Sequence, residues 1–152
     1  MVSAAPNELH IYDPVTQDDG IVPLGSVPLS VSVRPDGLFA AVGHRGSMSM
    51  VDLQTRTVTQ TIPVDMNMAA IVLASNGYAY GFPPANNFGG AVNSVQLSNG
   101  ALTSLDCSSC NYGRLHPSGN VIYTGGYSMS KLDISNDPQR TAIYPGQVAT
   151  SG

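Results

Sequence analysis

Short apolar runs alternate with polar turns along the whole chain, and no stretch shows a sustained helical period. Runs of this kind, rich in Val, Ile, Thr and Tyr, are typical of strands in a pleated, half-buried sheet. Gly, Pro, Asn and Asp occupy the breaks, where they supply the backbone angles and local hydrogen bonds that turns need. The pattern therefore predicts an all-β protein.

The runs are organised as a repeat. Three turn tripeptides, whose glycines are 40 and 42 residues apart, each stand between two strand-like runs: Pro35-Asp36-Gly37, Ser75-Asn76-Gly77 and Pro117-Ser118-Gly119. A second marker resembling V-D-L recurs out of phase with the first, at Glu8–Asp13, Ser49–Leu53, Asn93–Leu97 and Ser130–Ile134. A unit of about 40 residues with four short strands has the size of a β-propeller blade.

This repeat predicts a β-propeller that forms an open or partial ring. We expect a half blade at 8–25, complete blades at 28–64, 68–105 and 111–144, and a tail at 145–152. A β-sandwich is the competing fold, because it also has many short strands joined by frequent turns. A sandwich does not predict motifs that repeat at this period, whereas a propeller does.

The second unit resembles the YVTN-type β-propeller repeat, a relative of WD-repeat and lactonase-like propellers. That repeat has a Pro before its first strand, a PDG turn, a V-D-L or V-D-I run and a threonine-rich last strand, which correspond here to Val27–Gly37, Met48–Leu53 and Thr57–Val64. The third unit departs from it, with Gln96 in place of Asp and a longer loop. The resemblance runs from Leu9 to Tyr144 and implies a fold more than a function, because propellers host many roles.

The resemblance also implies how such a ring closes, with strands from both chain ends completing one shared blade. Here the half blade would need two strands after Tyr144, and Pro145–Gly152 is too short for two strands and a turn. Unpaired strand edges template association. We therefore expect a piece of a larger ring whose partners are the remaining blades of its parent chain. Self-association through the open edges is the alternative.

Composition limits the partner classes. Charged residues make up only 11% of the chain, and Lys plus Arg total 6 against 10 Asp plus Glu. Six scattered cations do not form the basic patch that nucleic-acid binding requires. No apolar run is long enough to span a membrane, and no signal peptide is visible. The low charge and the abundance of Ser, Thr, Asn and Gly favour an extracytoplasmic setting, whether periplasmic, surface or secreted.

One face of the predicted propeller is the candidate site. In a propeller, the loops between second and third strands share a face with the connections between blades, and loops on a rigid scaffold gather binding residues. Arg45 offers a bidentate fork to a carboxylate or another anion, although a solvated turn is the favoured interpretation of His44-Arg45. The candidate ligand-binding residues on this face are His44, Arg45, Asn86, Asn87, Phe88 and Tyr127.

The two cysteines, Cys107 and Cys110, stand in one of these connections. A lone CxxC lacks the second pair that a structural zinc site needs, and no helix N-terminus is predicted beside it to activate a thiol. We expect a local disulfide in an oxidising compartment. Free structural thiols and a metal or redox role are the alternatives.

The remaining polar repeats predict structure more than chemistry. Asp13, Asp52 and Asp133 recur at one blade position, where a carboxylate is expected to accept hydrogen bonds from the following turn. His10 and His116 are expected to be structural. No nucleophile–base pair, phosphate-binding loop or metal motif is present in the sequence, and no cofactor is predicted.

The sequence thus predicts a non-catalytic propeller module for protein or glycan binding or scaffolding, within a larger secreted or surface protein. The alternative is a fragment of a lactonase-like or quinoprotein-like propeller enzyme, so the question of activity stays open. Such enzymes place metal or cofactor ligands at the blade starts, and these are poor in ligands here: Leu29–Val31, Met68–Ala70 and Tyr112–Arg114. A third possibility is a purely structural repeat.

Overall fold

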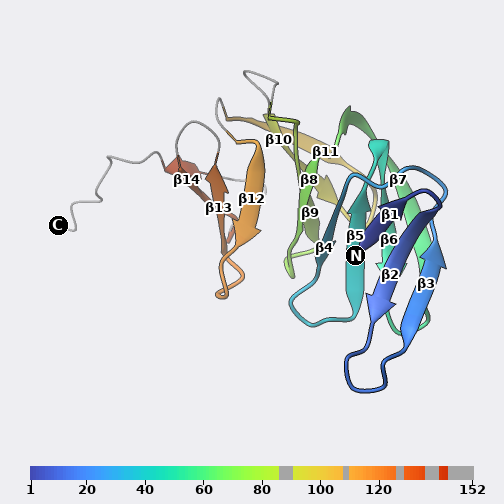
Figure 1. Cartoon of the computed structure of the whole chain (residues 1–152). Coiled ribbons are helices and arrows are strands. Elements are labelled where there is room, and N and C mark those ends of the chain that lie inside the picture. Colours follow the sequence, from blue (N-terminus) through green and yellow to red (C-terminus); the bar gives the residue numbers. More distant parts are fainter. Residues whose placement is uncertain (86–90, 108–109, 126–128, 136–140, 144–152) are drawn as a thin grey trace.

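The computed structural model describes residues 1–85, 91–107, 110–125, 129–135 and 141–143 (Figure 1). These residues form four antiparallel sheets, and each sheet keeps its strands in chain order. No helix occurs in the described ranges, and none there is long and apolar enough to cross a membrane. The all-β expectation is therefore confirmed.

The first sheet contains β1 (Val2–Ala4), β2 (Asn7–Tyr12) and β3 (Asp19–Pro23). The second contains β4 (Ser30–Val33), β5 (Phe39–Gly43), β6 (Arg45–Asp52) and β7 (Thr57–Asn67). The third contains β8 (Ala70–Leu73), β9 (Tyr78–Phe82), β10 (Ala91–Gln96) and β11 (Leu102–Asp106). The fourth contains β12 (Tyr112–Leu115), β13 (Val121–Gly125), β14 (Ser130–Asp133) and β15 (Thr141–Ile143).

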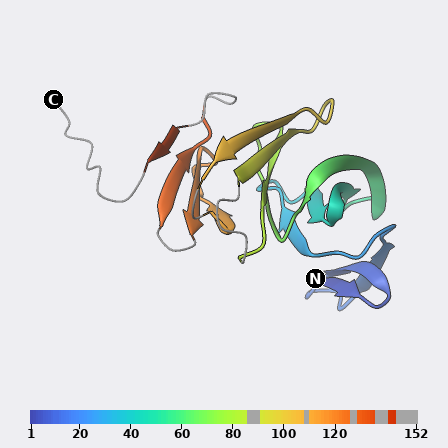
Figure 2. The same ribbon diagram turned by 90° about the horizontal axis from the view of Figure 1, so that it is seen from above.

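These sheets, called blades 1 to 4 below, stand side by side in an arc that is open in Figure 2. The first strands of the three four-stranded blades contact one another in turn, β4 with β8 and β8 with β12. They therefore line the inside of the arc, and the later strands of each blade lie progressively further out. This radial order is the arrangement of a β-propeller.

Blade 1 has one strand more than the half blade expected from the sequence. β1 pairs antiparallel with β2, and Val2 lies opposite Leu9. Val2 also packs against the apolar core between blades 1 and 2. A run of three residues is too short to show an alternating apolar and polar pattern, so the sequence does not indicate this strand. β1 is held in place by its pairing with β2.

Three apolar cores hold the blades together. Successive residues of a strand point to opposite faces, so Ala40 and Val42 of β5 pack toward blade 1 while Ala41 packs toward blade 3. In the same way Ile71 of β8 belongs to the core shared with blade 2, and Val72 to the core shared with blade 4. Each inner blade is thus buried on both faces.

The repeated turns have a common local cause. Gly37, Gly77 and Gly119 all adopt positive φ angles of 72°, 86° and 78°, which favour glycine. The amide of Gly37 donates to the carbonyl of Arg34 at 2.9 Å, and the amide of Gly119 donates to that of His116 at the same distance. The recurring glycine is therefore a backbone requirement of the turn between the first and second strands.

The V-D-L marker ends in a carboxylate that organises the next turn. Asp13 accepts a hydrogen bond from the amide of Val15 at 2.8 Å, and Asp133 accepts one from the amide of Ser135 at 3.0 Å. Asp52 accepts from two amides, at 2.9 and 2.8 Å. The structural role expected for these repeated aspartates is confirmed.

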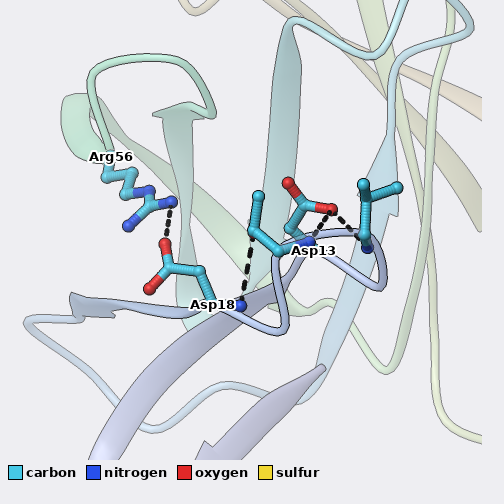
Figure 3. Close-up of polar contacts among 5 residues, drawn as sticks. Asp13, Asp18 and Arg56 are labelled. Atoms are coloured by element: carbon cyan, nitrogen blue, oxygen red, sulfur yellow. Dashed lines mark hydrogen bonds and ion pairs between the residues drawn. The ribbon is translucent and has the colours of Figure 1, made fainter.

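An arginine joins the turns of the first two blades (Figure 3). Arg56 donates to Asp18 at 2.5 Å, and its guanidinium lies over Gly20, where a Cβ would stand only 2.7 Å away. The two side chains are 43% and 51% exposed, so this ion pair adds little stability by itself. Its position fixes how the turn before β3 sits against blade 2.

The turn aspartates predict a decline in stability at low pH. Hydrogen bonds from the following turn lower the pKa of each carboxyl below its usual value near 3.8, led by those from the Val15 amide at Asp13, the Thr55 amide at Asp52 and the Ser135 hydroxyl at Asp133. Because folding favours the ionised forms, their stabilisation is complete above the unfolded pKa of about 3.9 and is lost as pH falls through the folded values.

We therefore expect the Tm to fall on acidification below about pH 4, and to fall less steeply in the triple variant D13N/D52N/D133N. Asn keeps an oxygen acceptor for the turn amides but does not titrate. Calorimetry between neutral and acidic pH measures the slope, and D65N, at an exposed position of β7, is the control. Parallel declines in the triple variant and the wild type would contradict this account.

Candidate functional site

The loop face predicted from the sequence is built at the end of the blades where the inner strands begin. Strand register brings Ser30 opposite Gly43 and Tyr112 opposite Gly125, so the starts of β4 and β12 lie beside the ends of β5 and β13. The connections between blades enter at the same end. Among the described residues, a hollow between blades 1 and 2 and another at the inner strands open on this face.

His44 is part of the scaffold beneath this face. Its side chain is fully buried, with Nδ1 3.0 Å from the carbonyl oxygen of Val27 and Nε2 2.9 Å from the hydroxyl of Ser49. A carbonyl only accepts, so Nδ1 carries the proton and Nε2 accepts from the Ser49 hydroxyl when the ring is neutral. His44 thus ties the connection between blades 1 and 2 to β6.

Arg45, the first residue of β6, is exposed to solvent, in contrast to the buried His44 before it. It lines an open hollow of about 430 Å³. Within the described residues Arg45 makes no ion pair. The other residues lining the hollow come from blade 1 and from the connection that follows it, and they are Asn7, Gly25, Ser26, Val27 and Leu29.

The lining combines one cation with exposed apolar side chains. Val27 is 51% exposed and Leu29 is 39% exposed, in a connection whose backbone is held by the buried His44. An arginine beside aliphatic surface suits a carboxylate flanked by an apolar group. Of the predicted site residues, the structure therefore brings Arg45 to an open surface and places His44 behind it.

Four other predicted site residues, Asn86, Asn87, Phe88 and Tyr127, lie outside the described residues. Their assignment to the binding face stays a prediction.

A second hollow, of about 250 Å³, was not predicted from the sequence. It lies at the starts of the inner strands, and its lining includes Tyr112 and Arg114 of β12, whose side chains turn to the outer face of blade 4. The sequence does place a cation, Arg114, at the start of a blade. The starts of adjacent blades, however, lie about 40 residues apart in the sequence and come together only in the folded arc. The other lining residues are Ser30, Val31, Ala69, Ala70, Ile71 and Gly113.

The cysteines are buried between blades 3 and 4. Cys107 and Cys110 have Cα atoms 5.5 Å apart, which is within the range of a disulfide. The sulfur of Cys110 lies 3.1 Å from the hydroxyl of Thr124 on β13. In the part of the chain that the structure describes, no three His, Cys, Asp or Glu side chains gather as they would to hold a metal ion.

Comparison with known proteins identifies the fold. No protein-family model and no curated protein matches the sequence. Hydrazine synthase from Kuenenia stuttgartiensis matches in structure with a TM-score of 0.69 at 20% identity, over 90% of this chain and 43% of that one. The β-propeller domain of Cps50 (Swd1) from Myceliophteria thermophila matches with a TM-score of 0.68 at 11% identity, over 91% and 49%.

At these identities the likeness concerns the fold alone. The chain spans less than half the length of each of these structures. The propeller fold expected from the repeat is confirmed, while membership of the YVTN-type family stays a prediction. The described residues fold as a partial β-propeller of three four-stranded blades and one three-stranded blade.

Proposed function

We propose that this chain is a non-catalytic β-propeller binding module whose Arg45 hollow holds a carboxylate-bearing segment of a partner protein. The observation that carries the proposal is the exposed guanidinium beside Val27 and Leu29, on a backbone fixed from behind by His44. A charge-assisted, bidentate contact to a carboxylate gives such a site both affinity and orientation.

A protein ligand suits the hollow better than a glycan does. Val27 and Leu29 present aliphatic surface that an apolar side chain would cover, next to an arginine, a residue enriched at protein interfaces. Because this lining is formed by a connection between blades, the scaffold is rigid while the residues at its rim are open to solvent. Loops held in this way are where binding residues gather.

A displayed library of random peptides tests the proposal. We expect selection on the wild-type protein to enrich peptides with Asp or Glu next to an apolar residue. Their affinity for the R45A variant should be at least about 10-fold weaker, because a hydrogen bond to a charged group contributes about 1.5–3 kcal/mol. R45K should bind with intermediate affinity, since it keeps the charge but not the planar fork.

The matched control is R56A, which removes an exposed arginine from a turn of blade 2 away from the hollow. It should leave the affinity of the selected peptides unchanged. The proposal fails if no peptide is enriched, or if the enriched peptides bind R45A as tightly as the wild type.

We further propose that Cys107 and Cys110 form a disulfide and that the protein works in an oxidising, extracytoplasmic compartment. The support is their separation, which suits a disulfide, and the rarity of structural disulfides in reducing compartments. Alkylation of the unfolded, unreduced protein followed by mass spectrometry decides the first point. Two alkylated cysteines in protein isolated from its native source would refute it.

A further inference from the structure

The arc of blades ends in two sheet faces that carry no neighbouring blade within the described residues (Figure 2). One is the outer face of blade 4 and the other is the outer face of blade 1. The three cores inside the arc are apolar, and no Asp, Glu, Lys or Arg is buried in the described part of the chain. The two end faces differ from these cores in composition and in charge.

The outer face of blade 4 is aromatic and basic. Gly113 and Ile122 face blade 3, so strand alternation turns Tyr112, Arg114 and Tyr123 outward. Tyr112 is 54% exposed and its ring lies over Gly125, while Tyr123 is 43% exposed and meets the edge of His116 at 5.8 Å between ring centroids. Lys131 lies opposite Tyr123 on the same face.

The acidic group at the rim of this face is Asp133, two residues after Lys131. Its carboxylate already accepts from the amide and the hydroxyl of Ser135, at 3.0 and 2.6 Å. The two cations Arg114 and Lys131 make no ion pair among the described residues. The face therefore presents positive charge between two tyrosine rings.

The outer face of blade 1 is acidic. Leu9 and Val22 pack toward blade 2, so Glu8, His10 and Asp19 face outward. The imidazole stands between the two carboxylates, 3.2 Å from that of Glu8 and 3.1 Å from that of Asp19. The N-terminal ammonium donates to the His10 carbonyl at the inner edge of the sheet. Two exposed apolar side chains complete this face, Tyr12 (62%) and Ile21 (49%).

From these faces we propose that two copies of this chain close into one ring, with blade 4 of each copy packed against blade 1 of the other. Opposite charge on the two faces favours this head-to-tail pairing and disfavours pairing of like faces. Each contact joins two different faces and is therefore heterologous. The ring closes because a two-fold axis, which coincides with the central axis of the ring, repeats this contact once.

The composition of the end faces suits contact with a second copy of this chain. Contacts between blades inside the chain are apolar, as suits surfaces that are never exposed after folding. Surfaces that meet only after separate chains have folded are more polar, because each chain must remain soluble before assembly. Tyr, Arg and Lys on one face and Glu, Asp, Tyr and Ile on the other match the second kind of surface.

Light scattering during size-exclusion chromatography tests the pairing. We expect the wild-type chain to have twice its 15.8 kDa mass. R114E makes both faces acidic and D19K reverses a charge on the acidic face, so each variant alone should shift to the monomer mass. An equimolar mixture of the two should regain the dimer mass, because each altered face then meets its complement.

Both substitutions are at exposed positions, so the variants are expected to fold, and circular dichroism checks this. D65K, a charge reversal at an exposed position of β7 in blade 2 and away from both end faces, is the matched control and should remain dimeric. A monomeric wild type overturns the proposal, as does a dimer that survives both variants or an assembly larger than two chains. Monomers that instead bind an added segment of neighbouring blades would also overturn it.

Discussion

Replacing Phe82 with alanine is expected to lower the free energy of unfolding by about 3–5 kcal/mol, the usual cost of removing a buried phenyl ring. Phe82, at the end of β9, is fully buried in the core between blades 3 and 4. Its ring reaches across to β12, where a Cβ built on Gly113 would stand 2.4 Å from the ring. For a chain of this length the loss corresponds to a fall in Tm on the order of 10 °C.

The close approach to Gly113 supplies the control. G113A alone should destabilise the protein, because the added methyl group meets the ring of Phe82. Combining G113A with F82L should cost less than the sum of the two single changes, since the smaller side chain leaves room for the methyl group. Urea unfolding measures all of these changes. Strict additivity, or an F82A effect below about 1 kcal/mol, would show that the two blades do not pack through this contact.

The fold was predictable where the signal is local and repeated. The turn at Gly37 needs positive φ, and the carboxylate of Asp52 accepts hydrogen bonds from the amides of Gln54 and Thr55. Each is a requirement of a few neighbouring residues, so the glycine recurs in blades 2 to 4 and the aspartate in blades 1, 2 and 4. β1 has no such signal, because Val2–Ala4 is a strand only through its pairing with β2. Its existence depends on tertiary context rather than on its own residues.

The site was predictable only as a face of the molecule. Sequence order shows that His44 and Arg45 lie in the same loop, but not which of them points outward. That direction is set by Val27, which is 17 residues away and accepts from the His44 ring. The hollow at Arg114 likewise depends on the meeting of three blade starts. Contacts of this range leave no periodic trace in the sequence.

The complementary charge of the two end faces was not predictable from the sequence either. Alternation along β2 and β13 was visible as strand pattern, yet it could not show that blades 1 and 4 stand at the ends of the arc. Only the arc shows that, within the described residues, Glu8 and Asp19 lie on a blade at one end and Arg114 lies on the blade at the other. The charge complementarity is thus a property of position in the ring.

Substitution of His44 by leucine is expected to lower the free energy of unfolding by about 2–4 kcal/mol. Leucine fills similar space but leaves the part-buried carbonyl of Val27 and the buried hydroxyl of Ser49 without their hydrogen bonds to the ring. Each unpaired buried polar group costs about 1–3 kcal/mol. Urea unfolding of H44L measures the loss. Adding S49A should cost less than the sum of the single changes, because it removes one of the orphaned groups.

R45A provides the sharpest comparison, because it alters the next residue along the chain. Arg45 is exposed and makes no ion pair among the described residues, so its loss should change the free energy of unfolding by no more than about 0.5 kcal/mol. If H44L proves neutral and R45A destabilising, the imidazole does not hold the connection between blades 1 and 2. If H44L destabilises the protein more than R45A does, as expected, His44 is part of the scaffold and Arg45 is free to contact a ligand.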